Sequence, residues 1–433
     1  MMKAFDTLVI GAGPAGIAAA VTAAERGRLV GLVDDNPAAG GQIWRGGAHL
    51  PSTARRWLHR LEASTVERLH GWKVFDSSEA GLLQAERTGA ATGDTTIRLR
   101  FGNLILATGA RERFLPFPGW TLPNVMGAGG LDAMVRGGLP IAGKRVVVAG
   151  TGPLLLAVAA HLAARGARIA AICEQARAGQ MMPLALHLLA QPGKLRQGVQ
   201  YRWGTRRSRY HTNCHAVAAH GDDRLRSVEL RRAEKRWTVN CDYLACGFHL
   251  VPNTELAALL GCRMEDGFVA TGELLQTSVP GVWCAGEPTG IGGVELSLLE
   301  GEMAGLAADG RAQEVQRLVP RRRTALRFVR ALKDACRLNP QLRTLAADST
   351  IVCRCEDVCV GLLRERENWR DAKLHTRCGM GPCQGRVCGG ATEFLFGWQA
   401  DSVRSPIFPA RVSGLAEPAD AADTYFDNLK ETV

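Results

Sequence analysis

The hydrophobic pattern of the chain alternates between short apolar runs and glycine-rich turns. Residues 6–10 (DTLVI) form an apolar run that predicts a buried strand, and an alanine-rich segment to about residue 26 predicts a helix. Further strands are predicted at 29–33 (LVGLV) and 103–107 (NLILA). The order of strand, glycine-rich turn, helix and strand is typical of α/β folds with a parallel sheet.

A second unit of the same kind begins near residue 144. Its pattern predicts a strand at 145–149 (RVVVA), a helix at 154–165 and a strand at 168–173. Residues 199–247 read as short, basic, partly antiparallel strands. We therefore interpret the two units as a duplication at the scale of a domain.

The C-terminal third changes character. A strand at 281–285 (GVWCA) is followed by a helix from about 294 to 308, and 313–345 is basic with a helical apolar stripe. These patterns predict five parts, with the first domain discontinuous. They are 1–118 with 248–312 (first dinucleotide-binding domain), 119–247 (second nucleotide-binding-like domain), 313–345 (helical linker), 346–400 (cysteine-rich domain) and 401–433 (tail).

Composition and charge exclude several classes of protein. With 433 residues, 46% hydrophobic and 22% charged, the chain has the composition of a globular protein, not of a disordered, collagen-like or disulfide-stapled one. The formal charge is +11, and arginine supplies 45 of the 53 basic residues. No nucleic-acid-binding motif accompanies this charge, so we expect no nucleic-acid partner; an arginine-rich surface for acidic ligands or an acidic protein is favoured.

No targeting segment is recognised. The longest apolar stretch, 146–160, contains glycine and proline and is shorter than the about 20 residues that cross a bilayer. We expect a cytoplasmic protein, and peripheral contact with the inner membrane is left open.

The first glycine-rich turn carries a full dinucleotide-binding fingerprint. Gly11, Gly13 and Gly16 follow a strand and open a helix, and Asp34 ends the next strand. The helix N-terminus supplies N–H groups for phosphates, and Asp34 is expected to bind ribose hydroxyls. The candidate residues are Gly11, Gly13, Pro14, Ala15, Gly16, Asp34 and its neighbour Asp35. This fingerprint alone does not distinguish FAD from NAD.

The second turn departs from the fingerprint. Gly150, Gly152 and Glu174 are present, but Leu155 replaces the third glycine, where it is expected to obstruct helix–strand packing or the pyrophosphate. Three alternatives stay open: NAD(P)H binding, an adenine nucleotide held structurally, and an empty site.

Six of the 13 cysteines lie between Cys353 and Cys388. An early Cys353-x-Cys355 pair and a late glycine-rich group suit either zinc or a [2Fe–2S] cluster, and a one-residue spacing is tight for a zinc knuckle. No Cys-x-x-Cys motif occurs, which argues against a disulfide reductase.

Three stretches resemble thioredoxin-reductase-like flavoproteins. Gly40-Gly41-Gln42 resembles their flavin-contacting loop, Ala107-Thr108-Gly109 their crossover motif, and 277–287 their late FAD motif. The resemblance implies FAD, with Gly41, Gln42, Ala107, Thr108, Gly109, Gly286 and Glu287 at the cofactor. Glu287 replaces the usual aspartate, so its contact with the ribityl chain must be longer or mediated by water.

The cysteine pattern resembles bacterioferritin-associated-ferredoxin-like [2Fe–2S] domains. That resemblance implies Cys353, Cys355, Cys383 and Cys388 as ligands, with Cys378 in reserve and Cys359 as a core thiol. The predicted fold is therefore a two-dinucleotide-binding-domain α/β flavoprotein, thioredoxin- or glutathione-reductase-like, with a small C-terminal [2Fe–2S] domain.

Residues 5–400 as a whole resemble the FAD/[2Fe–2S] alpha (A) subunits of heteromeric opine (octopine and nopaline) oxidases, hydroxyproline dehydrogenases and hydrogen cyanide synthase. The motifs that carry this are 40–45, 107–112 with 116–120, 150–155, 250–256 and 378–385. The resemblance implies an oxidoreductase component of a hetero-oligomer that takes electrons from a glycine/sarcosine-oxidase-like flavoprotein beta subunit for delivery to an external acceptor. A small third subunit is left open.

An opine- or hydroxyproline-type secondary amine is the favoured donor, oxidised on the partner. The alternatives are glycine oxidation by a hydrogen cyanide synthase, a self-sufficient NAD(P)H-dependent iron–sulfur reductase, and a non-enzymatic iron–sulfur partner. No histidine or carboxylate pair stands out as a substrate acid and base, so the catalytic residues stay unassigned.

Overall fold

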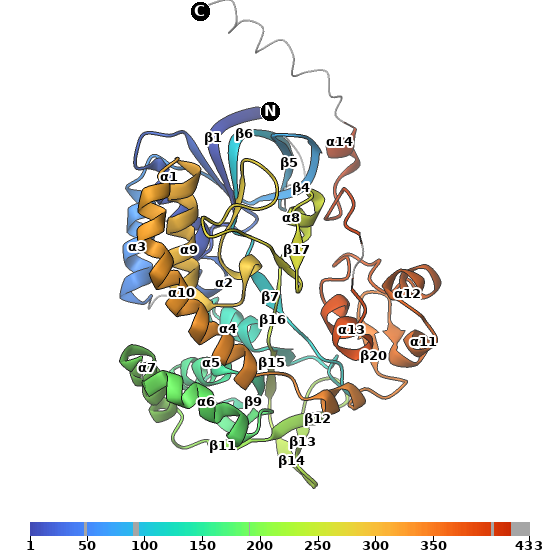
Figure 1. The fold of residues 1–433 in the computed structure, drawn as a ribbon. Helices are drawn as coiled ribbons and strands as arrows, with labels where there is room; N and C mark the ends of the chain where they lie inside the picture. Colours follow the sequence, from blue (N-terminus) through green and yellow to red (C-terminus); the bar gives the residue numbers. More distant parts are fainter. Residues whose placement is uncertain (47–49, 90–94, 190, 400–401, 417–433) are drawn as a thin grey trace, which may run out of the picture.

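The computed structural model describes residues 1–46, 50–89, 95–189, 191–399 and 402–416. Two α/β units lie one above the other in Figure 1, and a small cysteine-rich lobe lies beside them. Each α/β unit is built from segments that are distant in the sequence, so the chain crosses between the units more than once.

The first unit is built on a seven-stranded sheet in the order β3-β2-β1-β6-β5-β4, with β19 also paired to β6. Its centre is parallel: Val9 of β1 lies between Leu32 of β2 and Ile105 of β6. The strands are β1 Met2–Ile10, β2 Val30–Asp34, β3 Glu67–His70, β4 Trp72–Glu79, β5 Leu82–Arg87, β6 Thr96–Leu106 and β19 Val282–Cys284. The predicted strands at 6–10, 29–33 and 103–107 fall in β1, β2 and β6, with Leu29 and Ala107 just outside the strands.

Two helices cover one face of this sheet in close contact with each other. They are α1 (Pro14–Ala24) and α9 (Gly293–Ala308), and both are almost wholly buried. Glycine permits the contact, because a Cβ at Gly301 would collide with the Ala15 carbonyl oxygen. Smaller elements complete the unit: α2 Gly41–Trp44, α3 Ser52–Glu62, α8 Glu255–Leu259, β17 Met264–Glu265, β18 Phe268–Val269 and the 3₁₀ turn Glu287–Thr289.

The second unit repeats the plan on a five-stranded parallel sheet in the order β11-β10-β9-β15-β8. Its elements are β8 Val125–Gly127, α4 Ala128–Arg136, β9 Arg145–Thr151, α5 Pro153–Ala164, β10 Arg168–Glu174, α6 Ala178–Leu189, α7 Pro192–Gly204, β11 Arg209–Thr212 and β15 Tyr243–Phe248. A separate antiparallel sheet holds β12 Cys214–His220, β13 Ser227–Arg232 and β14 Lys235–Asn240. The expectation of strands from residue 199 was wrong at its start, because α7 continues to Gly204.

A two-stranded ribbon joins the two units. It pairs β7 (Ala110–Glu112) with β16 (Leu250–Pro252) in antiparallel register. At its end the Glu112 carboxylate accepts the backbone N–H groups of Gly129 and Gly130, at 2.7 and 2.9 Å, in the first turn of α4. The ribbon is therefore anchored to the second unit at the N-terminus of a helix, where a carboxylate is stabilised.

The long helix α10 (Ala312–Ala335) runs from the first unit down over the second (Figure 1). The segment after it leads to the cysteine-rich lobe, made of β20 Ile351–Cys353, β21 Val358–Cys359, α11 Val360–Arg364, α12 Trp369–Thr376 and α13 Cys388–Phe396. The chain then returns to the first unit, where the Ile407 N–H donates to the Phe75 carbonyl and Gly414 of α14 (Val412–Leu415) packs on Phe75. None of the described helices is long and apolar enough to cross a lipid bilayer.

Candidate functional site

The first glycine-rich turn has the close contacts that its glycines predict. Gly11 has a φ of +103°, and its N–H donates to the Val33 carbonyl at 2.7 Å. A Cβ at Gly11 would collide with the Ala107 carbonyl oxygen, and a Cβ at Gly16 with that of Gly11. Both positions therefore need glycine for the fold itself, whatever ligand the turn holds.

Gly13 differs from its neighbours because a Cβ there would meet no protein atom within 4 Å. It precedes α1, whose first N–H groups have no partner within the helix. The loop at 40–42 forms the wall of this space: the Gly40 N–H donates to the Ala12 carbonyl, and a Cβ at Gly41 would lie 2.9 Å from Gly13 Cα. Open space against a helix N-terminus suits a pyrophosphate.

Asp34 and Asp35 follow the same strand, but only one faces the turn. The Asp34 carboxylate is buried and accepts the Ala12 N–H at 2.5 Å and the Asn36 N–H at 2.8 Å. Asp35 is exposed, and its side chain accepts from the Asn36 amide. Asp34 is thus positioned beside the glycine-rich turn, as expected for a ribose-binding acid.

The late motif places Glu287 at the end of β19, near the N-terminus of α9. One carboxylate oxygen accepts the Gly293 N–H at 3.0 Å, and the other, Oε2, is buried without a hydrogen-bond partner among the described residues. Burial raises the pKa of Glu287 to about 7. A buried acceptor that lacks a donor fits the predicted contact with a flavin hydroxyl, so the residues present fit FAD.

Glu300 is a buried residue of the candidate site that the sequence analysis missed. It is completely buried in α9, accepts the Gly286 N–H at 2.9 Å and pairs with Arg322 Nε of α10 at 2.8 Å. It therefore fixes the turn that presents Glu287. Glutamates at 300 and 302 inside the mostly apolar run LSLLEGEMAGLAA are the signal that could have revealed it.

The crossover motif is tied to the ribbon between the units. The Thr108 hydroxyl donates to the Asn253 carbonyl at 2.5 Å, and the Asn253 side-chain amide donates to the Thr108 carbonyl at 2.9 Å. The Asn253 N–H also donates to the Gly109 carbonyl. The two segments that connect the units, which contain Thr108 and Asn253, are thus hydrogen-bonded to each other next to Ala107. The Ala107 carbonyl lies against Gly11 of the first glycine-rich turn.

In the second unit, Glu174 forms a closed set of hydrogen bonds. Its carboxylate accepts the Gly152 N–H at 2.7 Å, the Thr151 hydroxyl at 2.6 Å and the Ala176 N–H at 2.9 Å, and the side chain is completely buried. Its pKa is raised by burial. No part of this carboxylate is free to meet a ribose.

The segment after α10, which we call the connector (residues 336–339), lies over the second glycine-rich turn. The Cys336 carbonyl accepts from His249 Nε2 and lies 3.4 Å from the Thr151 hydroxyl oxygen, and the Arg337 carbonyl accepts from the Gln175 amide at 3.1 Å. A Cβ at Gly152 would meet the Cys336 thiol at 3.6 Å. Whereas the space beside Gly13 is open, the chain itself covers the corresponding turn here.

Leu155 does not act as expected. Its side chain is completely buried and packs toward β15, where a Cβ at Gly247 would lie 3.2 Å from Leu155 Cδ2. Helix and strand therefore pack closely with leucine on the helix, because glycine on the strand leaves room for it. Leu155 therefore does not obstruct helix–strand packing, contrary to that part of the prediction, and the connector is what covers the turn.

The cysteine-rich lobe gathers three buried thiols. The sulfur atoms of Cys353, Cys378 and Cys388 all lie within 4.8 Å of one another. Hydrogen bonds from the other two thiols, with the N–H groups of Gly379 and Glu356, lower the pKa of Cys353 far below its usual value. Such donors stabilise a thiolate, which is the form that binds a metal.

The other two predicted ligands form a second group beside the first. Cys355 is exposed and lies within hydrogen-bonding reach of the Cys383 N–H and thiol. A Cβ at Gly381 would collide with Cys355 Cβ, and the Trp369 ring packs on Gly379. The structure therefore brings the four predicted ligands and the reserve Cys378 into one lobe, while Cys359 lies outside the group of three. A set of cysteine thiolates with backbone donors fits an iron–sulfur cluster.

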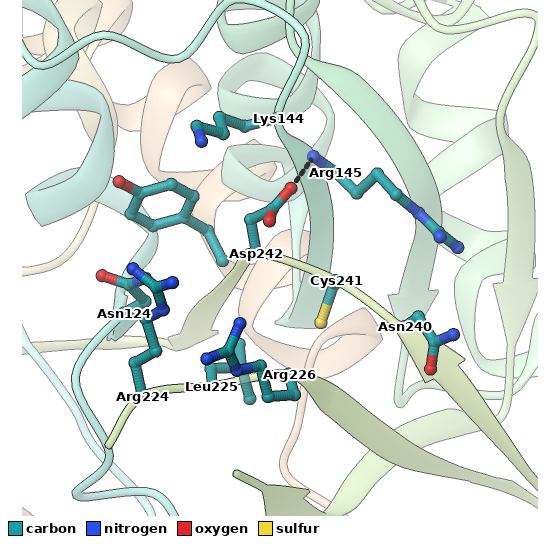
Figure 2. Close-up of a pocket in the computed structure, with 10 residues that line it drawn as sticks. Asn124, Lys144, Arg145, Arg224, Leu225, Arg226, Asn240, Cys241 and Asp242 are labelled. Atoms are coloured by element: carbon teal, nitrogen blue, oxygen red, sulfur yellow. Dashed lines mark hydrogen bonds between the residues drawn. The ribbon is translucent and has the colours of Figure 1, made fainter. Parts of the chain in front are cut away.

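A polar pocket of about 220 Å³ lies where β9 and β15 of the second sheet begin, at the end of the sheet away from the second glycine-rich turn (Figure 2). Asp242 accepts the Arg145 N–H at 2.7 Å within it, and Cys241 is buried. Its other lining residues include Lys144, Arg224 and Arg226. None of the predicted cofactor-binding residues lines this pocket, so the candidate site is elsewhere.

Comparison with known families agrees with this geometry. Residues 5–305 match the family described as pyridine nucleotide-disulphide oxidoreductase. The chain belongs to this family. It is therefore a flavoprotein oxidoreductase, and the α/β fold predicted from the sequence is confirmed.

Relatives within the family support a narrower assignment. The chain is 34% identical to the A subunit of opine oxidase from Rhizobium meliloti (strain 1021), over 96% of this chain and 100% of that protein. It is 30% identical to the HcnB subunit of hydrogen cyanide synthase from Pseudomonas aeruginosa, over 88% and 90%. The resemblance inferred from the motifs is confirmed for these two kinds of subunit.

One solved structure extends the likeness over almost the whole chain. L-proline dehydrogenase from P. horikoshii superimposes with a TM-score of 0.65 at 18% identity, covering 96% of this chain and 80% of that one. At this identity the likeness concerns the fold alone.

Proposed function

We propose that this chain is the electron-transfer subunit of a hetero-oligomeric amino-acid dehydrogenase or oxidase. A glycine/sarcosine-oxidase-like flavoprotein partner would oxidise an opine- or hydroxyproline-type secondary amine, and this chain would pass the electrons to an external acceptor. FAD would lie on the turn from Gly11 to Gly16, and a [2Fe–2S] cluster in the cysteine-rich lobe. A flavin takes up two electrons and such a cluster releases one at a time.

The contact between the cysteine-rich loop and the crossover carries this proposal. Arg111 of β7 donates from Nε to the Arg386 carbonyl at 3.1 Å, inside the loop from Cys383 to Cys388. Its Nη1 donates to the Asn253 side chain at 2.7 Å, and Asn253 is bonded to Thr108. A continuous set of hydrogen bonds thus joins Thr108, a predicted flavin contact, to the loop between the predicted ligands Cys383 and Cys388.

Other contacts fix the lobe in this position. Arg111 also pairs with Glu255 at 2.8 Å, and Arg113 donates to the Gly390 carbonyl and to Glu393 in α13. These arginines are largely buried, so their pairs hold better than exposed ion pairs. The lobe is therefore docked on the flavin unit by charged contacts along one ribbon.

The proposal is tested by anaerobic titration of the purified chain, alone and with its co-expressed partner subunit. We expect flavin bleaching and the rhombic paramagnetic signal of a reduced cluster when an opine or hydroxyproline is added to the complex. The isolated chain should respond to neither substrate. Rapid bleaching of the isolated chain by NADH would instead favour a self-sufficient reductase.

Replacing Arg111 by leucine tests the contact itself. We expect both cofactors to stay bound but electron transfer from flavin to cluster to slow, because the hydrogen-bonded contact is lost. Arg343→Leu is the matched control, since Arg343 donates to the Phe394 carbonyl of the same lobe away from the crossover. Equal slowing in both variants would contradict a special role for Arg111.

Glycine is the second candidate substrate. The extent of the match to the HcnB subunit of hydrogen cyanide synthase favours it. In the complex, cyanide release with glycine and no turnover of secondary amines would decide for this alternative.

A further inference from the structure

Helices α6 and α7 form a hairpin at the outer edge of the second unit (lower left in Figure 1). The hairpin is held by α10 and α5, and other sides of both helices are exposed. α6 packs Leu184 and Leu188 against α10, and α7 places the Tyr201 ring against His161 of α5 with centroids 5.9 Å apart. Lys194 at the start of α7 lies over the Phe328 ring and pairs with Glu295.

The free sides of both helices carry exposed apolar side chains at helical spacing. Met182, Leu186 and Leu189 of α6 are 59, 62 and 67% exposed. On α7, Leu195, Val199 and Trp203 are 37, 60 and 69% exposed, and none of the described residues of α7 is buried. A contiguous stretch of such side chains marks an interaction surface, whereas single ones are ordinary.

The charge around these apolar stripes has one sign. Residues 175–221 contain no aspartate or glutamate but seven lysines and arginines, of which Arg196, Arg202, Arg206 and Arg207 lie on or directly after α7. Arg206 lies over the Trp203 ring, 5.0 Å from its centroid. Val199, Arg202, Trp203 and Arg206 together line a shallow hollow.

An apolar stripe flanked by arginines on the same helix requires a counterpart that is both apolar and anionic. A phospholipid surface is such a counterpart, because its acyl chains and phosphates lie side by side, and helices that carry arginine beside tryptophan and leucine bind at this boundary. Long arginine side chains can reach the headgroups while tryptophan and leucine enter the boundary below them. Amphipathic helices of this kind lie in the plane of such a surface.

We propose that the α6–α7 hairpin docks this chain on an anionic phospholipid membrane, with Met182, Leu186, Val199 and Trp203 in the headgroup–acyl boundary. The surface lies outside both candidate cofactor sites, so this proposal stands independently of the function proposed above. If both hold, the hairpin keeps the complex next to electron acceptors that are dissolved in the membrane.

Sedimentation with lipid vesicles tests the proposal on the purified full-length chain. We expect binding to vesicles that contain phosphatidylglycerol, much weaker binding to pure phosphatidylcholine, and a loss of binding as salt is raised. Absence of binding to the anionic vesicles at low salt would overturn the proposal.

Variants locate the binding surface. Val199→Ser with Trp203→Ser should weaken vesicle binding by about tenfold or more, because two apolar side chains no longer leave water. Leu362→Ser with Leu374→Ser is the matched control, since these side chains are 54 and 70% exposed on the cysteine-rich lobe. All four positions are on the surface, and an unchanged flavin content would show that the variants fold.

The same variants distinguish a lipid surface from a protein partner. Vesicle binding equal to that of the unaltered chain, together with loss of co-purification with the partner subunit, would make the hairpin a protein-docking face and overturn the proposal. Replacing Arg202, Arg206 and Arg207 by glutamine should remove the preference for anionic vesicles, whereas Arg224→Gln with Arg226→Gln should leave it unchanged.

Discussion

The Gly152 N–H donates to the Glu174 carboxylate at 2.7 Å, and the Ala12 N–H donates to the Asp34 carboxylate at 2.5 Å, each across 22 residues of sequence. Both units therefore use the acid at the end of their second strand to hold their own glycine-rich turn. The two acids differ in exposure and in their further partners: Glu174 is 0% exposed and also accepts from Thr151 and Ala176, whereas Asp34 is 9% exposed and also accepts from Asn36.

Glu174 is consequently expected to stabilise the fold and not to bind a ligand. Glu174→Ala should lower the free energy of unfolding by about 2–4 kcal/mol, because three donors lose a buried acceptor. Denaturant unfolding measures this, with Glu234→Ala as the exposed control (95% exposed side chain). A loss of stability that appeared only with added dinucleotide would contradict this role.

The connector predicts that NADH and NADPH do not reduce the flavin of this chain. A Cβ at Gly152, in the turn that a pyrophosphate would approach, would lie 3.6 Å from the Cys336 thiol, and the Arg337 carbonyl accepts from Gln175, whose N–H donates to the Gly150 carbonyl of that turn. Stopped-flow mixing with micromolar NADH should leave the flavin oxidised, whereas dithionite reduces it. Fast bleaching by NADH would show that the turn is accessible.

Gly13→Val should yield folded protein without FAD. Gly13 has a φ of −75°, and a Cβ added to it would meet no protein atom within 4 Å, so the protein has room for valine. The branches of the valine side chain would instead enter the space assigned to the pyrophosphate. Flavin absorbance of the purified variant measures the loss. Gly272→Val, at a loop glycine with equally open surroundings, should keep its flavin; stoichiometric FAD in the Gly13 variant would refute the assignment.

Glu287 should make FAD binding depend on pH. Burial raises the pKa of its carboxyl to about 7 in the flavin-free protein, and a hydroxyl donating to the charged form lowers this pKa on binding. Binding then releases a proton. The affinity of the flavin-free protein for FAD is therefore greatest above pH 7 and falls by up to about tenfold per pH unit below it.

Fluorescence titration of the flavin-free protein at several pH values measures this trend. Glu287→Gln removes the titrating group, so its affinity should be weaker and nearly constant between pH 5 and about 8. An unaltered chain whose affinity does not change across pH 7 would contradict the predicted contact.

Serine at Cys353, Cys355, Cys383 or Cys388 should abolish or destabilise the cluster and leave FAD bound, because the lobe has its own core. Iron and acid-labile sulfide are measured for each variant, with Cys359→Ser as the control that keeps them. The decisive comparison is Cys378→Ser, since the Cys378 sulfur lies within 4.8 Å of those of Cys353 and Cys388. A full cluster in the Cys383 variant but none in the Cys378 variant would show that Cys378, and not Cys383, is a ligand.

Local sequence rules predicted the parts of the fold in which each residue acts within its own element. The runs at 6–10 and 145–149 lie in β1 and β9, and the glycines at 11 and 16 sit where a side chain would collide with the backbone. Turn chemistry and strand patterns are short-range properties, so they are legible in a single sequence.

Contacts between distant segments could not be predicted in this way. The partners of Arg111 at Asn253 and Arg386 are 142 and 275 residues away, and the connector meets Thr151 across 185 residues. Leucine at position 155, in place of the third glycine, looked damaging because the compensating Gly247 lies on another strand. Tertiary packing decides such pairs, and one sequence does not record which residues meet.

The connector is attached covalently to the second unit, so its concentration at the glycine-rich turn does not depend on what is dissolved around the protein. A segment joined covalently to the fold is present at its turn at an effective concentration on the order of millimolar or above, and it is never diluted. A dinucleotide in solution competes with this tethered segment. It would displace Cys336 from its place beside Thr151 only if it bound the turn strongly enough to offset that effective concentration. We therefore expect the tethered connector to compete with dinucleotides at this turn, even though both the glycines and the acid are retained.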